Sequence, residues 1–391
     1  MAVDWTLVLL SGSTLDELGE VAPTSVTMRW ERNRGAVIKS MTLPHDAPGA
    51  AELVANREFG TPVLLAFRRD SLHDDDAPEP RLSVRLDTIT HDLDQDGVPI
   101  MGLTWADPLG RPLSQATSSA TFSSTPSAEI AQQLIETENT DAPSGLRVGT
   151  VVAGTTSRDR VFNLQPIASA IYELADLGDF KLQLTHLDPR RHGGDLAEIS
   201  FLADLGHDLS DLVLFAAGPG TDANVLSVSV QEIPPVNQVT TTVRHAGAYP
   251  GDPNMGAIVA ATLKDLSSIA KWGKFELVQE TPDALNNADL AAKAAALLQP
   301  DPRHSVQFTP DPHSAPQPWE DFWLWDTVRL LCDSHHLRID TAEPVVAIEI
   351  DLDENLQESA IRVEFGEPRR TETELIQGVT ERVYFLEHPN S

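Results

Sequence analysis

The stretch Asp92-Leu-Asp-Gln-Asp-Gly-Val-Pro-Ile-Met-Gly-Leu-Thr-Trp105-Ala-Asp-Pro108 has a counterpart near the end of the chain, Asp351-Leu-Asp-Glu-Asn-Leu-Gln-Glu-Ser-Ala-Ile-Arg-Val-Glu-Phe365-Gly-Glu-Pro368. Both stretches contain an acidic turn, an alternating strand, an aromatic residue, an acid and a proline. The second is one residue longer, and we expect the extra residue in the hairpin turn. Upstream, Thr61-Pro-Val-Leu-Leu-Ala-Phe67 similarly parallels Thr327-Val-Arg-Leu-Leu-Cys332. This internal repeat predicts two related β-barrels, one near each end of the chain.

Short segments with period-two patterning surround both copies, as is typical of small antiparallel barrels. In the first hundred residues, strands are predicted at 25–30, 36–43, 63–67, 81–89 and 99–105, with one short helix between 47 and 56. Near the end of the chain, strands are predicted at 305–309, 325–331, 345–352 and 360–365.

The middle of the chain has a different pattern. Residues 114–126 are rich in Ser and Thr and are interpreted as a connector between domains. Helices are predicted at 128–135, from Pro166 to Gly178, at 255–270 and at 283–298, and strands at 180–184, 213–217 and 224–233. The predicted fold is therefore mainly β, with two related small barrels (residues 1–113 and 301–391) flanking an α+β block (114–300).

Composition excludes several classes of protein. The 391 residues are 41% hydrophobic and 22% charged, which is ordinary for a chain with a buried core. With 28 basic and 59 acidic residues the formal net charge is −31, so binding to nucleic acid through phosphate contacts is not expected. The start of the chain lacks the basic region of a signal peptide, and no apolar run reaches the roughly 18 residues of a membrane span. We expect a chain made in the cytoplasm, without a membrane span.

Two glycine-containing motifs are interpreted as turns. Asp92-x-Asp94-x-Asp96-Gly97 matches the first half of a calcium-binding loop, but the twelfth position is Leu103 instead of a glutamate and a strand follows. An Asp-Gly hairpin tip fits better. Gly218-Pro-Gly220 follows an apolar strand as a dinucleotide-binding turn does, but leads into another strand.

Catalytic and metal signatures are not found. Cys332, the only cysteine, lies near His335 and His336, but no second cluster supplies a fourth zinc ligand, and adjacent histidines on a strand point to opposite faces. With 59 carboxylates, choosing an acid/base pair would be arbitrary. We predict no catalytic, cofactor-binding or metal-binding residues and no enzyme activity.

The densest aromatic cluster consists of Trp319, Phe322, Trp323 and Trp325. On a strand, Trp323 and Trp325 would share one face and Leu324 would lie on the other. Core or a subunit interface is the favoured interpretation, and a sugar-binding platform is the alternative.

Several of these stretches together resemble the tail-hub (baseplate hub or minor tail) proteins of long-tailed bacteriophages, in particular siphophages of Actinobacteria. The resemblance lies in Arg29-Trp-Glu-Arg-Asn33 leading to Thr42-Leu-Pro44, Phe162-Asn-Leu164 before a helix closing at 175–180, Asp211-Leu-Val213 leading to Gly218, and Trp325-Asp-Thr-Val328. The last motif is more usually Gly-Asp-x-Val in the family, so Trp325 replaces a glycine.

The resemblance implies a structural protein of the virion, at the tail tip, assembled in the host cytoplasm. It implies a homotrimer whose six barrels form a pseudo-sixfold ring, with the distal tail protein and tail tube above it and tip or fibre proteins and the tape measure protein below. Genomic DNA would pass without specific binding, and the acidic charge would repel phosphate. The alternatives are a hexameric distal-tail ring and a tail protein that binds or degrades envelope glycans. Residues 369–391 include a strand pattern at 379–385 that could pair across subunits.

Overall fold

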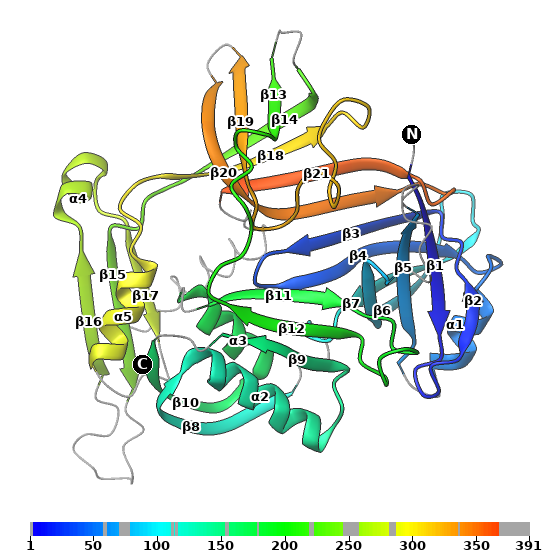
Figure 1. Ribbon diagram of the computed structural model, residues 1–391, viewed down its shortest axis with the longest axis horizontal. Coiled ribbons are helices and arrows are strands. Elements are labelled where there is room, and N and C mark those ends of the chain that lie inside the picture. The colour runs from blue at the N-terminus through cyan, green and yellow to red at the C-terminus, as the bar shows by residue number, and fades with distance from the viewer. Residues whose placement is uncertain are drawn as a thin grey trace.

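The computed structural model describes residues 3–57, 61–69, 79–110, 113, 116–152, 156–177, 180–218, 223–244, 258–280, 287–334 and 337–366. The fold is mainly β, as the sequence predicts, and the helices lie outside one large sheet (Figure 1). That sheet has 13 strands, and three smaller sheets of two, three and three strands lie beside it. In the described residues, no helix is long and apolar enough to cross a membrane.

Six strands of the large sheet form the first ring. In spatial order they are β1 (Asp4–Leu10), β5 (Val63–Arg69), β6 (Leu82–Leu93), β7 (Pro99–Ala106), β4 (Gly35–Pro44) and β3 (Ser25–Glu31), and all neighbours are antiparallel. Strand β2 (Glu17–Glu20) adds to the free edge of β1, and α1 (Ala50–Asn56) connects β4 to β5. The alternating apolar side chains of β3 and β4 point into the ring, as the period of two predicts.

Six further strands form the second ring. In spatial order they are β13 (Leu214–Ala217), β19 (Thr327–Ser334), β20 (Leu337–Leu352), β21 (Glu358–Gly366), β18 (Arg303–Pro310) and β14 (Val225–Ile233). Asn224 closes this ring, since its side chain donates to Leu214 O (2.8 Å) and accepts from Ala216 N (2.8 Å). Strands β13 and β14 come from residues 214–233, which the sequence placed in the middle block.

The two rings have the same topology. Numbered along the chain within each ring, the strands lie in the order 1-4-5-6-3-2 in both. The pairs that the sequence repeat identified occupy equivalent places: the β6–β7 hairpin corresponds to β20–β21, and β5 corresponds to β19. The rings differ at one contact, because β1 and β5 are antiparallel whereas β13 and β19 are parallel.

The two repeated hairpins have the same turn, of the same length. Asp94 Oδ1 accepts from Asp96 N (2.9 Å) and Val98 N (2.8 Å), and Asp353 Oδ1 accepts from Asn355 N (2.8 Å) and Gln357 N (3.0 Å). The prediction that the extra residue lies in the turn is therefore wrong. Asp351 pairs with Ala360 and Leu352 pairs with Glu358, so the extra residue, Ser359, forms a β-bulge at the start of β21.

Strand β20 joins the rings. Its C-terminal half pairs with β21 on one side and with β3 on the other, so one strand serves both rings. The first ring closes on the turn that follows β20, where Asp4 and Gln357 form a bridge and Trp5 N donates to Leu356 O (2.9 Å). The apolar interiors are continuous: one core cluster includes Met28 and Ile38 of the first ring and Phe308 and Phe365 of the second.

The first inserted module lies between the rings in the chain. Its elements are β8 (Thr117–Pro126), α2 (Ser127–Asp141), β9 (Leu146–Val151), β10 (Ser157–Pro166), α3 (Ile167–Asp176), β11 (Lys181–His186) and β12 (Ala197–Leu202). Strands β8 and β10 pair, each ends in a proline followed by a helix, and Phe122 and Phe162 contact edge to face at 6.0 Å. The prediction of a connector at 114–126 is wrong over 117–126, which pairs with β10, because Thr and Phe favour strands once a partner strand is present. Residues 114 and 115 lie outside the described residues.

The second inserted module interrupts the second ring between β14 and β18. Its elements are β15 (Gln238–Arg244), β16 (Ile258–Lys264), α4 (Leu266–Trp272), β17 (Glu276–Glu280) and α5 (Asn287–Leu297). The helix predicted at 255–270 is wrong over 258–264, which pairs with β15 as a strand, and residues 255–257 lie outside the described residues. The helix begins only at Leu266, because Asp265 accepts from Ser268 N (2.8 Å) as its N-cap.

Candidate functional site

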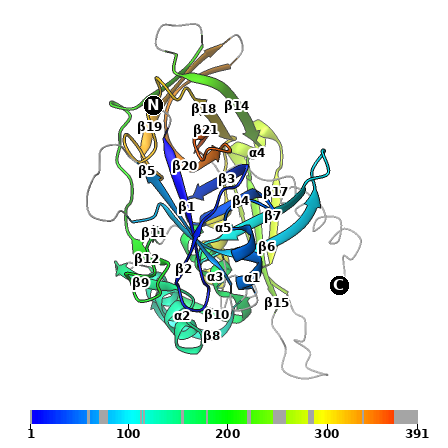
Figure 2. The ribbon, with the colours of Figure 1, turned by 90° about the vertical axis from the view of Figure 1, so that its right-hand side faces the viewer.

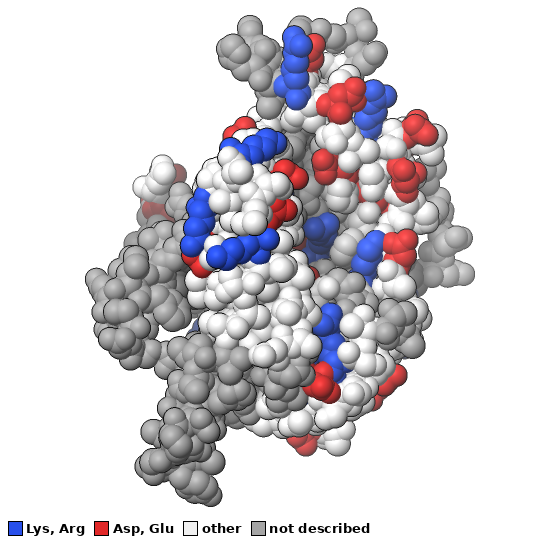
Figure 3. All heavy atoms as spheres, turned by 90° about the vertical axis from the view of Figure 1, so that its left-hand side faces the viewer, with Lys and Arg blue, Asp and Glu red and all other residues white. Residues whose placement is uncertain are grey.

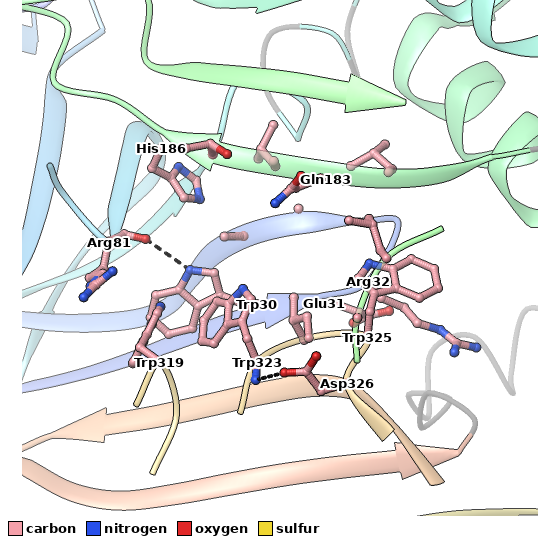
Figure 4. Close-up of a pocket in the computed structure, with 18 of the residues that line it drawn as sticks. Trp30, Glu31, Arg32, Arg81, Gln183, His186, Trp319, Trp323, Trp325 and Asp326 are labelled. Carbon is pink, nitrogen blue, oxygen red and sulfur yellow. Dashed lines mark hydrogen bonds between the residues drawn. The ribbon is translucent and has the colours of Figure 1, made fainter. Parts of the chain in front are cut away.

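A cavity of about 490 Å³ lies where the first ring, the first inserted module and the 319–326 loop meet (Figure 4). Its walls come from Trp30 of β3 and from Arg32 just beyond that strand, from β11 with Gln183 and His186, and from the loop with Trp319, Trp323 and Trp325. The cavity therefore joins segments that lie more than 100 residues apart in the sequence.

Four tryptophans form a continuous cluster at one wall. Trp319 and Trp323 stack with ring centroids 4.4 Å apart, and Trp30 meets Trp319 edge to face at 5.2 Å. Trp5 completes the cluster at 5.8 Å from Trp319. Trp319 and Trp323 also pack against the shared core, so most of this aromatic surface is used to hold the loop on the first ring.

The 319–326 loop is not the strand that the sequence predicted for Trp323 to Trp325. Trp319 and Trp325 have φ of 66° and 78°, in the left-handed region that non-glycine residues rarely adopt. Asp326 holds this geometry, because its carboxylate accepts from Trp323 N (2.7 Å) and from His207 N (2.8 Å). Strand β19 begins only at Thr327.

Cations cover aromatic faces around the cavity. The guanidinium of Arg32 and the ammonium of Lys181 lie 5.3 and 5.2 Å from the centre of the Trp325 ring. The Arg68 side chain is fully buried, lies 5.2 Å from the Trp319 ring, and pairs with Glu358 (3.0 Å) and Glu320 (3.2 Å). These contacts hold β5, the loop and β21 together, and they occupy ring faces that a sugar would need.

The cavity also contains a histidine that stays neutral. Burial lowers the pKa of His186 to about 4, and Nδ1 accepts a hydrogen bond from Ser83 N (3.2 Å), which requires this nitrogen to be unprotonated. A buried imidazole with a backbone donor on one nitrogen is a structural contact between β6 and β11, not a proton carrier at neutral pH.

A charged network crosses the joint between the rings. Arg29 of β3 donates to both carboxylate oxygens of Glu364 (2.9 and 3.0 Å) on β21. Glu349 of β20, which lies between them, pairs with Lys39 (2.8 Å) and Arg362 (2.6 Å). Burial lowers the pKa of Arg29, but the hydrogen bonds and charges of Glu364 and Glu31 outweigh this effect and raise the pKa above its usual value. The joint is therefore fixed by buried charges as well as by the strand ladder.

The motifs singled out in the sequence are structural where the structure describes them. Asp92 to Gly97 form an exposed hairpin end, and the described residues contain no cluster of three or more His, Cys, Asp or Glu that could hold a metal ion. Gly218 has φ of 134° at the end of β13, while residues 219–222 lie outside the described residues. Cys332 is a buried free thiol, and His335 and His336 also lie outside them.

Sequence comparisons identify no relative: no protein-family model and no curated protein sequence matches the chain. Many solved structures match, and three of them are aligned with this chain over nearly the whole length of both chains. They are the tail protein from Neisseria meningitidis MC58 (TM-score 0.53, 11% identity, 93% and 96% of the two chains covered), the 43 kDa tail protein of prophage MuSo2 from Shewanella oneidensis (0.52, 11%, 92% and 98%) and the prophage tail protein gp18 from Listeria monocytogenes EGD-e (0.51, 10%, 96% and 98%).

At 10–11% identity these likenesses bear on the fold alone. They cover both rings and both inserted modules, because more than nine-tenths of this chain is aligned in each case. The chain thus shares its fold with these three tail proteins.

Proposed function

We propose that the protein is a structural component of a phage tail tip, the hub that joins the tail tube to the tip. Two features support the proposal: the two rings of identical strand order within one chain, and the fold shared over nearly full length with prophage tail proteins. The motifs that resemble hubs of actinobacterial siphophages make such a phage the proposed origin.

The duplicated ring is the observation that carries the proposal. A trimer would present two similar rings per chain, six in all, to a sixfold tail tube and distal tail protein, while remaining threefold toward tip or fibre proteins and the tape measure protein. A closed assembly of identical chains needs such symmetry matching wherever a sixfold and a threefold part meet. The buried network at Arg29 and Glu364 would hold the two rings of one chain in a fixed relation.

The charge fits a passage for DNA. A net charge of −31 per chain gives a trimer a strongly negative field, which repels phosphate and keeps a moving strand from adhering. Genomic DNA would pass without specific contacts, and the protein would act without cofactor or catalysis.

Particle imaging tests the proposal. Electron microscopy of assembled tails should show three copies of this chain in a ring of six similar densities, and the protein mixed with its tail partners should form such rings. Six copies, with only one ring of each facing the tube, would favour the hexameric distal-tail ring instead. A protein that stays monomeric with its tail partners would refute both.

Glycan binding is the alternative function that the tryptophan-lined cavity suggests. Its polar groups include Gln183 and Arg81, and a cavity of about 490 Å³ could take a sugar unit. Binding of cell-wall fragments that is lost in a Gln183→Ala variant of unchanged stability would support this role. Unchanged assembly together with no glycan binding would leave the hub as the better explanation.

A further inference from the structure

The second inserted module carries an exposed surface that differs from the rest of this acidic chain. Leu266 and Trp272 of α4 are 73% and 42% exposed, and Phe275 just beyond is 40% exposed. Three of the chain's six lysines, Lys264, Lys271 and Lys274, lie within the same eleven residues. We define these six residues as the α4 patch. Figure 3 faces this module and shows basic side chains at the margin of an uncharged surface.

The lysines of the patch are available for a partner. Lys264 and Lys271 make no ion pair with the described residues, and all three lysines are exposed. Lys274 pairs with Glu276, and the ammonium of Lys271 lies 4.5 Å from the centre of the Trp272 ring. An aromatic and aliphatic centre with a basic margin is the composition of a protein interface that takes an acidic partner.

A surface that complements the α4 patch lies on the opposite side of the same molecule. The end of the β6–β7 hairpin is exposed at nine consecutive positions, residues 91–99, and projects from the rest of the molecule (Figure 2). It presents Leu93, which is 69% exposed, and Val98, which is 42% exposed, together with Asp92 and Asp96. Asp94 shapes the turn through its backbone hydrogen bonds, so Asp92 and Asp96 are the carboxylates left to meet a partner.

The two surfaces lie far apart in one molecule. Strands β6 and β7 lie in the right half of Figure 1 and the α4 module lies at the left end, so a hairpin cannot reach the patch of its own chain. Two different, complementary surfaces at separate places form a head-to-tail contact between copies, and such contacts close into rings when the rotation allows.

From these surfaces we infer that the β6–β7 hairpin end of one copy docks on the α4 patch of the next copy. Leu93 and Val98 would pack on Trp272 and Phe275, while Asp92 and Asp96 would pair with Lys264 and Lys271. This inference rests on the proposed ring and names the contact that closes it.

Charge reversal tests the contact in the full-length protein. By sedimentation velocity over a wide concentration range, Lys264→Glu/Lys271→Glu should shift assembly to at least tenfold higher concentration, and Asp92→Lys/Asp96→Lys should do the same. The combination of all four substitutions should recover most of the loss. Arg329→Glu/Arg338→Glu is the matched control, because it makes the same change in net charge at exposed residues of the second ring.

A covalent trap gives a second measurement. Val98→Cys combined with Phe275→Cys, in a Cys332→Ala background, should give disulfide-linked multimers under oxidation, whereas Leu226→Cys with Phe275→Cys should not. Leu226 is a suitable control because it is 66% exposed on β14.

The outcomes separate this inference from the proposed function. Rings that form equally well with reversed charges, or equal cross-linking in the control pair, would overturn the contact and leave the hub proposal in place. A protein that remains monomeric with its tail partners and does not cross-link would overturn both. Loss of assembly on removal of residues 367–391, with the reversed-charge variants unaffected, would assign assembly to that segment and overturn the contact between the hairpin end and the α4 patch.

Discussion

Replacing Arg29 by methionine should destabilise the joint between the two rings. Arg29 donates to both carboxylate oxygens of Glu364, whose side chain is only 4% exposed, and Glu349 lies 3.7 Å from Arg29. Methionine keeps most of the aliphatic volume but leaves the Glu364 carboxylate buried beside Glu349. Removing one partner of a buried pair costs about 3–5 kcal/mol, because the remaining charge stays desolvated.

Equilibrium unfolding in urea, followed by tryptophan fluorescence, measures this loss. Trp5, Trp30, Trp319 and Trp323 lie next to the joint, so their fluorescence reports on it. Arg329→Met is the matched control, since Arg329 also donates to both oxygens of a carboxylate, that of Asp340, but both side chains are more than half exposed. Its loss should be below about 1 kcal/mol.

The double variant Arg29→Met/Glu364→Gln sharpens the test. Removing both charges should recover much of the stability, because the cost comes from a buried carboxylate that has lost Arg29 and not from the missing attraction. If Arg29→Met is no more destabilising than Arg329→Met, the buried network does not hold the rings together and the reasoning fails.

Three further predictions concern the turns and a buried acid. Asn224→Ala should lower the free energy of unfolding by about 1–3 kcal/mol, measured by heat or urea, because it removes the side-chain partner of Ala216 N and Leu214 O where the second ring closes. A loss below about 0.5 kcal/mol, the usual effect of a surface substitution, would show that Asn224 does not close the ring. Asp353→Ala should destabilise the protein more than Asp94→Ala, by about 1 kcal/mol, because Leu356 O in the 353–357 turn also accepts a hydrogen bond from Trp5 N of β1, whereas the 94–98 turn is exposed. Equal melting temperatures of the two variants would contradict this. Burial raises the pKa of Asp107 to about 6, although backbone hydrogen bonds from Gly110, Ala36 and Leu109 act to lower it. Between about pH 4 and 6 the native state then binds more protons than the unfolded state, so the free energy of unfolding should fall as pH rises through that window, on the order of 3 kcal/mol relative to Asp107→Asn. A difference between the two proteins that does not change with pH would refute the assignment.

Much of the architecture could be read from period-two patterning and from the repeated hairpin. Asp92 and Asp351 begin segments that fold alike because the same aspartate hydrogen bonds shape both turns. The extra residue could not be located from sequence, since a bulge at Ser359 and a longer turn give the same residue count. The strand pairing of β16 was also missed, because the Ala-rich run at 258–264 fits a buried helix or a strand equally well.

The site was harder to predict than the fold. The tryptophans of the 319–326 loop stand out in the sequence, but their left-handed backbone depends on Asp326 receiving hydrogen bonds from Trp323 and from His207, which is more than a hundred residues away. The tail-hub motif that this stretch resembles, in which a glycine takes the place of Trp325, was the available signal for that backbone, since glycine favours positive φ. The two proposed docking surfaces had two signals in the sequence, the acidic hairpin tip at 92–97 and the grouping of three lysines at 264–274, but nothing in the sequence related one to the other.

Strand β20 has a mechanical consequence. Its C-terminal half belongs to the walls of both rings at once, so neither ring can tilt without bending a strand that is also paired in the other. Force applied at the far end of one ring is transmitted through a hydrogen-bonded ladder instead of through a hinge. Cutting the polypeptide inside β20 would open both rings together, so no proteolytic half of this molecule should persist as an independent unit.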